Sequence, residues 1–239
     1  MKILTDLHCH TVASTHAYST VKELLEAARD KGLEAIAVTD HGVELPDAPH
    51  LWHFVNLTCL PEAMYGVRLL RGCEVNILDE EGHIDMPEAL LGKLDIVVAS
   101  IHTPAFSGTE PGKDQTRAYL GALENPYVDI IGHSGNPKYP YKYDPVLLKA
   151  KQLHKLIEIN AHSFAARPQN VENCRNIALR CKELGVGVAV NSDAHFCGKV
   201  GAYGPAVEML AEIGFPEELI MNRSLDVLRE YLKDRKTIC

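Results

Sequence analysis

The feature of this sequence that most restricts its fold is the alternation of apolar, β-branched runs with segments of helical periodicity. Strands that alternate with helices pair in parallel, because each connection has to return over the face of the sheet. Seven parallel strands close into a barrel more readily than they form an open sheet. We therefore expect an α/β fold: a distorted, TIM-barrel-like (β/α)7 barrel of parallel strands with outer helices. The seven runs are residues 3–7, 35–39, 69–75, 96–101, 128–131, 156–159 and 186–190.

Several connecting segments carry signals of helix boundaries. Thr20 followed by Glu23 is the pattern of a capping box and predicts a helix over residues 21–31. A short apolar run at residues 219–221 is a candidate eighth strand. No linker, repeat or break in composition divides the chain, so residues 1–239 are expected to form a single domain. Further helices are predicted over residues 144–155, 169–184 and 224–232.

Side chains that can bind metal ions follow these runs where the strands are expected to end. In a parallel barrel the carboxyl ends of all strands meet at one face, which is where active sites lie. Residues far apart in the sequence therefore converge in one pocket. The polar residues at these ends are His8, His10, Asp40, His41, Glu74, His102, His133, Asp193 and His195.

Two pairs of these candidates are separated by a single residue. His8 and His10, on one strand, place both side chains on the same face. Cys9 between them should point the opposite way, into the packing against the helices. Asp193 and His195 repeat the spacing if the last strand continues through them.

Asp6 and Asp40 each stand beside a candidate ligand. As acceptors of imidazole N–H groups they would orient the neighbouring histidines. A helix cap or a hydrogen bond within the core is the alternative, and the sequence leaves both interpretations open.

The types of ligand indicate which metals this pocket would hold. Imidazole and carboxylate without thiolate suit Zn²⁺, Mn²⁺ or Fe²⁺ better than Mg²⁺ or Ca²⁺. The candidates outnumber the ligands of one tetrahedral site, so two or three ions are implied, with a carboxylate such as Glu74 bridging. Such a site polarises a phosphoryl or carbonyl oxygen and generates hydroxide from bound water. The chain has no G-x-S-x-G, Walker A or dinucleotide motif, so serine hydrolase, NTPase and dehydrogenase functions lack support.

The composition narrows the partners and the compartment. A net charge of −8 argues against nucleic acid, whose phosphate backbone requires a positive surface. No run approaches the ~18 apolar residues of a membrane span, and the first residues do not resemble a signal peptide. The seven cysteines are scattered and form no C-x-x-C pair. Reduced thiols and a cytoplasmic location are therefore expected.

The strand-end motifs resemble those of the PHP (polymerase and histidinol phosphatase) superfamily, and within it the YcdX-like phosphatase branch. Two loops, residues 47–54 and 135–139, resemble this branch in particular, and the resemblance covers nearly the whole chain. The matching stretches are Asp6-Leu-His-Cys-His10 with Ser14-Thr-His16, Thr39-Asp-His41-Gly42, Gly72-Cys-Glu74-Val-Asn76, the strand ends at His102 and His133, and Ser192-Asp193-Ala-His195.

The resemblance implies a trinuclear, usually zinc, cluster, so three Zn²⁺ ions per chain are expected, with Mn²⁺ or Fe²⁺ as alternatives. It also makes a homo-oligomer, such as a trimer, the expected assembly. By the family's motifs, His8, His10, Glu74 and Asp193 would hold one ion, Glu74 would bridge to a second ion held with His102 and His133, and His16, His41 and His195 would hold the third.

These features together predict a metal-dependent phosphoesterase that hydrolyses small phosphomonoesters by in-line attack of a metal-bridging hydroxide. Asp193 or His195 would move the proton to the leaving group, and the sequence does not choose between them. Three alternatives stay open. A PHP-type nuclease or phosphodiesterase is disfavoured by the acidic net charge, and an amidohydrolase by the lack of a strand-end lysine for a carbamylated bridge. A non-catalytic metal-binding module is disfavoured by the complete set of ligands.

Overall fold

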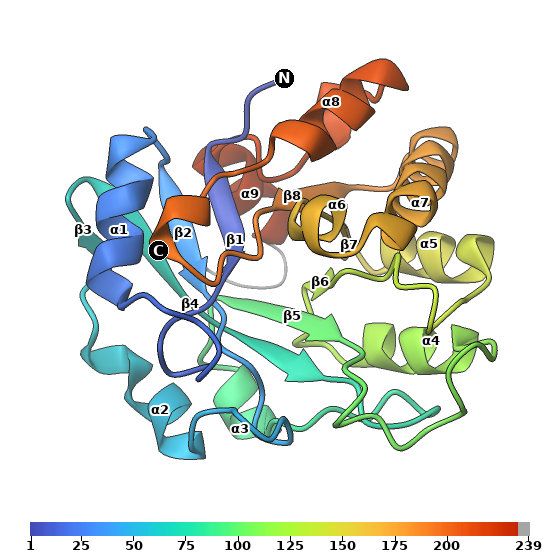
Figure 1. The fold of residues 1–239 in the computed structure, drawn as a ribbon, viewed down its shortest axis with the longest axis horizontal. Coiled ribbons are helices and arrows are strands. Elements are labelled where there is room, and N and C mark those ends of the chain that lie inside the picture. Colours follow the sequence, from blue (N-terminus) through green and yellow to red (C-terminus); the bar gives the residue numbers. More distant parts are fainter. Residues whose placement is uncertain (234–239) are drawn as a thin grey trace.

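The computed structural model describes residues 1–233, and its main sheet has the predicted parallel topology (Figure 1). All seven predicted strands are present, and each pairs in parallel with the next along the sheet. A further strand, β3 (Ala63–Met64), pairs antiparallel with β4 outside this path. The order of the seven is β1 (Thr5–Cys9), β2 (Ala35–Val38), β4 (Val67–Asn76), β5 (Ile96–Ser100), β6 (Ile130–Ile131), β7 (Leu156–Asn160) and β8 (Val188–Asn191).

The barrel closes between β8 and β1 through a few contacts instead of a full ladder. Ala194 forms a single parallel bridge with Cys9, and the His10 N–H donates to the Ala194 carbonyl at 2.9 Å. The Leu7 N–H donates to the side chain of Asn191 at 3.1 Å. The barrel is therefore distorted at this seam, as the sequence predicted.

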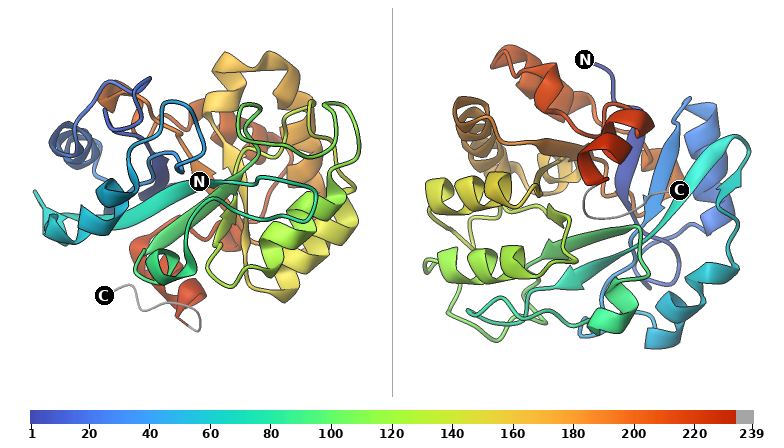
Figure 2. Two further views of the ribbon diagram at one scale, coloured as in Figure 1. Left: turned by 90° about the horizontal axis from the view of Figure 1, so that it is seen from below. Right: turned by 180° about the vertical axis from the view of Figure 1, so that it is seen from behind.

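Helices cover the outside of the barrel (Figures 1 and 2). The four predicted helices are all present, whereas the others were not anticipated, since most of them are short. None of the helices in the described part of the chain is long and apolar enough to span a bilayer. The helices are α1 (Val21–Asp30), α2 (Leu51–Val55), α3 (Glu88–Leu91), α4 (Thr116–Glu124), α5 (Tyr143–Gln152), α6 (His162–Ala166), α7 (Val171–Leu184), α8 (Gly204–Glu212) and α9 (Leu225–Leu232), with 3₁₀ turns at Asn56–Cys59, Pro168–Asn170, Cys197–Lys199 and Glu217–Leu219.

The predicted capping box forms at the start of α1. The Glu23 N–H donates to the Thr20 hydroxyl, and the Thr20 N–H donates to the Glu23 carboxylate at 2.7 Å. The candidate strand at residues 219–221 does not form. Its place is taken by the end of a 3₁₀ turn and one bridge between Ile220 and Val188, because the run is too short to build a ladder.

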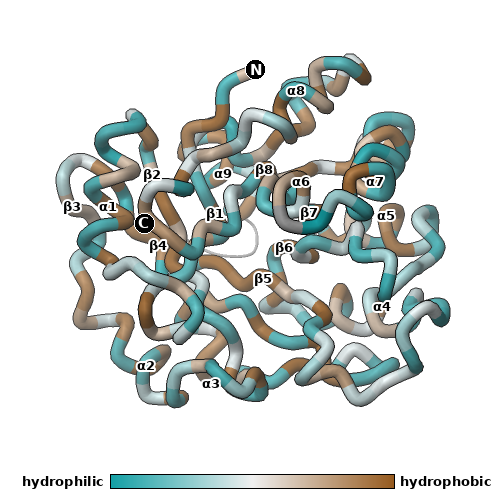
Figure 3. Tube along the Cα trace, viewed as in Figure 1, coloured by the Kyte–Doolittle hydropathy of each residue, from teal (hydrophilic) through white to brown (hydrophobic). Residues whose placement is uncertain are grey.

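Inward-facing side chains change from apolar to polar along the strands. On β4 the inward positions run from Leu70 to the buried Glu74, and on β7 they run from Leu156 to the buried Glu158. The apolar stretches of β4 and β5 are visible in Figure 3. The amino half of the barrel is therefore a hydrophobic core, and the carboxyl half forms a polar chamber.

Helix α9 closes the apolar end of the barrel. Leu228 and Leu232 are fully buried and pack in one cluster with the inward side chains of the strands, such as Leu7 and Leu70. Seen from behind (Figure 2, right), α9 lies over these strands. The end of the barrel that stabilises the fold is therefore opposite the end that carries the metal-binding candidates.

We predict that Leu228→Ala lowers the free energy of unfolding by about 3 kcal/mol, because it leaves a cavity in a closed apolar layer. Metal content and turnover below the unfolding transition should stay at the wild-type level, since α9 lies away from the polar chamber. Urea unfolding measures the first effect. Leu148→Ala, at a side chain that is 49% exposed, is the matched control and should change stability by less than about 0.5 kcal/mol. Equal losses in the two variants would contradict the role given to α9.

Candidate metal centre

A bulge in β1 orients the first two candidate ligands. Between Asp6, opposite Ile36, and Cys9, opposite Val38, β1 contains one residue more than β2. Such an extra residue resets the alternation of side chains. Leu7 therefore faces the barrel core, while Cys9 packs in the outer hydrophobic cluster and the histidines on either side face the polar chamber. The prediction for Cys9 is confirmed. The six cysteines of residues 1–233 are free thiols, and Cys239 lies outside the described residues.

Glu74 lies at the centre of the site. Its carboxylate is fully buried and accepts a hydrogen bond from the Ser100 hydroxyl at 2.6 Å. Five imidazoles from four strands or their carboxyl ends (β1, β2, β5 and β6) surround it, as the convergence of strand ends predicted. The distances from its carboxylate oxygens are 3.3 Å to His8 Nε2, 3.5 Å to His10 Nε2, 2.8 Å to His41 Nδ1, 3.6 Å to His102 Nε2 and 3.0 Å to His133 Nε2.

Asp193 reaches the same cluster through a turn. The last strand does not continue through it, so the condition for a strand-like spacing with His195 is not met: β8 ends at Asn191 and Asp193 has a φ of 51°. Aspartate tolerates this left-handed conformation better than most residues. The turn directs its Oδ1 to within 3.3 Å of His10 Nε2 and 3.5 Å of His195 Nδ1.

His16 completes the cluster from a loop. Its Nε2 lies 2.9 Å from His195 Nε2 and 3.3 Å from His41 Nε2, while its Nδ1 contacts Asp47. The structure therefore brings together all nine residues that the sequence singled out. How they divide among ions is a separate question.

The charge balance of the chamber requires cations. Glu74, Glu158 and Asp193 are buried there, and within residues 1–233 their ion pairs are all with histidine. Burial by itself would raise the pKa of each carboxyl, but His8 and the other surrounding histidines together outweigh it and lower all three pKa values. Three buried carboxylates thus remain charged with no lysine or arginine beside them.

This environment raises the pKa of some of the histidines and lowers the pKa of others. Burial opposes a charge on His8 and His41, yet the adjacent Glu74 raises the pKa of both above the ordinary value. Burial lowers the pKa of His10 to about 3 and also lowers the pKa of His102 and His195. These last three imidazoles are neutral at pH 7, which is the form that binds metals. The three buried carboxylates and these neutral imidazoles are together a donor set suited to cations.

Buried polar atoms without hydrogen bonds point to the same conclusion. Within the described chain these atoms include Nε2 of His8, both ring nitrogens of His10, Nδ1 of His41 and Oε2 of Glu74. Buried polar groups are normally hydrogen-bonded, so an ion in contact with these atoms would supply the missing partner. The donor set therefore fits metals that prefer nitrogen and oxygen ligands. Groups with ligand atoms within 4.8 Å of one another are His10, His41 and His195; His8, His10 and Asp193; and His41, Glu74 and His102.

Some residues of this site escaped the sequence analysis. Glu158 Oε1 lies 2.8 Å from His8 Nδ1, and Asn160 donates to both Glu158 and Asp193. Asn76 Oδ1 lies 2.8 Å from His102 Nδ1. The sequence does contain a signal for Glu158 and Asn160. These two polar residues alternate with Ile in a buried strand, so both side chains must lie on its inner face.

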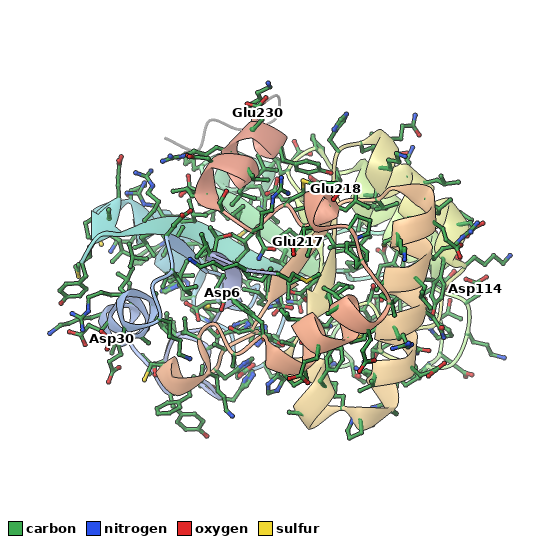
Figure 4. The ribbon with its side chains drawn as sticks, turned by 90° about the horizontal axis from the view of Figure 1, so that it is seen from above. Asp6, Asp30, Asp114, Glu217, Glu218 and Glu230 are labelled. Atoms are coloured by element: carbon green, nitrogen blue, oxygen red, sulfur yellow. The ribbon has the colours of Figure 1, made fainter. Side chains whose placement is uncertain are left out.

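Asp6 and Asp40 act as hydrogen-bond acceptors for loops. Asp6 lies among the strands (Figure 4) and accepts from the N–H groups of Ser192 and Gly201. Asp40 accepts from the N–H and hydroxyl of Thr11. Neither carboxylate accepts a hydrogen bond from a candidate imidazole in the described structure, so the core hydrogen-bond alternative is the correct one.

Comparison with known proteins agrees with this geometry. A sequence model of the PHP domain matches residues 6–165. The chain belongs to the PHP domain family. A protein of Thermoanaerobacter sp. (strain X514) named "Probable phosphatase" is 48% identical over 237 residues, which cover 99% of this chain and 97% of that protein.

Two solved structures share the fold of this PHP protein. Histidinol phosphate phosphatase from Lactococcus lactis, complexed with zinc, L-histidinol and phosphate, aligns with a TM-score of 0.62 and 17% identity over 89% of this chain and 94% of that one. A chain in an archaeal ribonuclease P with mature tRNA aligns with a TM-score of 0.59 and 11% identity over 96% of this chain and 90% of that one. At these identities the likeness concerns the fold alone.

We predict that Asp40→Asn lowers the free energy of unfolding by about 2 kcal/mol at pH 7, because a buried acceptor of several hydrogen bonds is weakened. Burial would raise the pKa of Asp40, but His53, whose Nε2 lies 3.1 Å away, and the N–H and hydroxyl of Thr11 outweigh it and lower the pKa. A lowered pKa contributes stability above the unfolded value of about 3.9 that is lost as the pH falls through the folded value.

The difference between wild type and Asp40→Asn should therefore narrow as the pH falls below about 4. Urea unfolding of both chelator-treated proteins from pH 7 to pH 3 measures it. A difference that is constant over this range would contradict a charged Asp40.

Proposed function

We propose that this protein hydrolyses small phosphomonoesters at a cluster of three metal ions held by the nine residues described above. At the level of enzyme class it is a metal-dependent phosphatase, since relatives 48% identical along nearly its whole length carry that name. The observation that carries the finer proposal is the convergence of five imidazoles on the buried carboxylate of Glu74, with polar atoms that have no other partner.

The ligands divide most simply as the family's motifs suggest. Glu74 would belong to two ions, because one of its oxygens lies 3.5 Å from His10 Nε2 and the other lies 3.0 Å from His133 Nε2. Zinc suits this donor set of nitrogen and oxygen, and zinc is present in the Lactococcus lactis phosphatase. One ion would be held by His8, His10, Glu74 and Asp193, a second by Glu74, His102 and His133, and the third by His16, His41 and His195.

When bound, such ions polarise phosphoryl oxygens and lower the pKa of water. The chain supplies position and proton transfer. Glu74 and its imidazoles fix the cluster inside the barrel, so that a substrate meets it only from the carboxyl face. Asp193 and His195 lie 3.5 Å apart and would pass the proton of the attacking water to the leaving oxygen. Burial lowers the pKa of His195, so its imidazole is neutral near pH 7, the form that would bind the third ion.

A small monoester is the substrate class that fits this site. A phosphomonoester dianion has three terminal oxygens, enough to contact each of three cations, whereas a diester has two and a lower charge. The net charge of −8 gives a long polyanion no attraction beyond the cluster. The single domain over residues 1–239, the cytoplasmic location and the trimeric assembly stay predictions.

We predict that metal-replete wild-type protein contains three ions per chain by elemental analysis, and that Glu74→Gln contains fewer and has no measurable turnover. The substitution keeps the shape of the side chain and removes the charge that joins two ions. Circular dichroism should show that the barrel stays folded. Glu81→Gln, at an exposed carboxylate paired with Arg117, is the control and should match the wild type. One ion or none in the wild type would contradict the cluster.

We also predict that kcat/KM is at least tenfold higher for a small monoester than for a diester with the same leaving group, a gap of ~1.4 kcal/mol in transition-state stabilisation. Parallel assays of a monoester, a diester and an amide on the zinc-loaded protein test this preference. Faster cleavage of the diester would favour a nuclease, and cleavage of the amide alone would favour an amidohydrolase.

A further inference from the structure

In each proposed ion site, one histidine contacts a carboxylate that is not itself a ligand candidate. The contact is direct for two of these histidines and passes through Asn76 for the other. His8 Nδ1 lies 2.8 Å from Glu158. His102 is backed by Asn76, whose amide donates to Asp85 at 2.6 Å. His16 Nδ1 contacts Asp47. Such partners fix the orientation of a ligating imidazole and raise its basicity, and their loss typically weakens metal binding ~10–100-fold.

The carboxylate behind His8 is held rigidly. Glu158 lies inside strand β7 and its side chain is fully buried. Besides His8, it accepts hydrogen bonds from the His133 N–H at 2.7 Å and from the side chains of Asn160 and Asn191 at 3.0 and 2.9 Å. These contacts come from the segment that follows β6 and from strands β7 and β8.

The carboxylate behind His102 is almost as well enclosed. Asp85 is buried and accepts from both the N–H and the amide of Asn76, at 2.8 and 2.6 Å, and from the Glu44 N–H at 2.9 Å. Asn76 is the last residue of β4. The imidazole of His102 is therefore fixed through the end of a strand.

The third pair differs because both of its members come from exposed loops. The side chain of His16 is 49% exposed and that of Asp47 is 27% exposed, and neither residue belongs to a helix or strand. The one backbone hydrogen bond that ties the two loops at this point runs from the Thr15 N–H to the Asp47 carbonyl, at 3.2 Å. Local opening of these loops exposes the pair without disturbing the barrel.

We propose that the ion held by His16, His41 and His195 is the exchangeable member of the cluster, and that Asp47 is the positioning residue that sets its affinity. Glu158 and Asp85 keep the other two ions resident. This inference rests on the proposed function, since it presupposes three ions. It makes the enzyme responsive to metal supply: the two-ion form persists when metal is scarce, and the third site fills only when free metal rises.

The test is the release of zinc from fully loaded protein to a chromogenic chelator, with elemental analysis after gel filtration. We expect the wild type to lose one ion per chain in a fast phase and two in a slow phase. The Asp47→Asn variant should either contain two ions per chain or release the ion of the fast phase at a rate at least tenfold higher than that of the wild type. Glu158→Gln should instead accelerate the slow phase.

The matched control is Asp79→Asn. Asp79 forms a His–Asp pair with His83 at 2.8 Å on the surface, away from the nine candidates, so this variant should keep three ions and wild-type release. Release of all three ions in one phase from the wild type would overturn the inference, and this measurement needs no folded variant. Wild-type release from Asp47→Asn would overturn it as well. A metal-replete wild type with one ion or none would instead overturn the cluster itself, whereas two ions under these conditions would overturn the third, exchangeable site.

Discussion

The structure depends on the buried carboxylate of Glu74, because burial of an unpaired charge is unfavourable in free energy. Glu74 lies inside the barrel with no lysine or arginine among its partners in residues 1–233, and five imidazoles surround it. A buried charge persists only when opposite charge and hydrogen bonds compensate it. Four strands serve that requirement, because β1, β2, β5 and β6 or their carboxyl ends each bring one or two side chains to this carboxylate on β4. Metal ions would supply the opposite charge that Glu74 requires, and the nitrogen and oxygen donors around it suit them.

The barrel separates stability from chemistry along its axis. Its amino half is filled by aliphatic side chains and closed by Leu228 and Leu232 of α9. Its carboxyl half is lined by residues that would destabilise an ordinary core, such as Glu158 and Asn160. Burial of the aliphatic side chains offsets the unfavourable free energy of burying the polar ones. Loops surround the entrance to the polar chamber. This arrangement lets ligand positions be rigid where strands supply them and adjustable where loops do, as for His16.

The fold alone does not decide the reaction. A histidinol phosphate phosphatase and a chain of an archaeal ribonuclease P share it at 17% and 11% identity, and one barrel can host many chemistries. The assignment of this chain to the phosphatases rests instead on relatives at 48% identity that are named probable phosphatases. The nine ligand candidates in one chamber fit a metal-dependent reaction, and the proposal of a small substrate rests on the acidic net charge.

The sequence by itself determined the parallel barrel and the meeting of the residues at the strand ends, because strand alternation and ligands at strand ends are local patterns whose consequence is general. His16 was added only by the family resemblance. The sequence did not reveal the bulge between Asp6 and Cys9, since a bulge exists only relative to the neighbouring strand. It left open whether the last strand continues through Asp193, whose backbone has a positive φ in the structure. Nor did it pair His8 with Glu158, 150 residues apart. Such contacts follow from the register of the closed sheet, which only the tertiary structure decides.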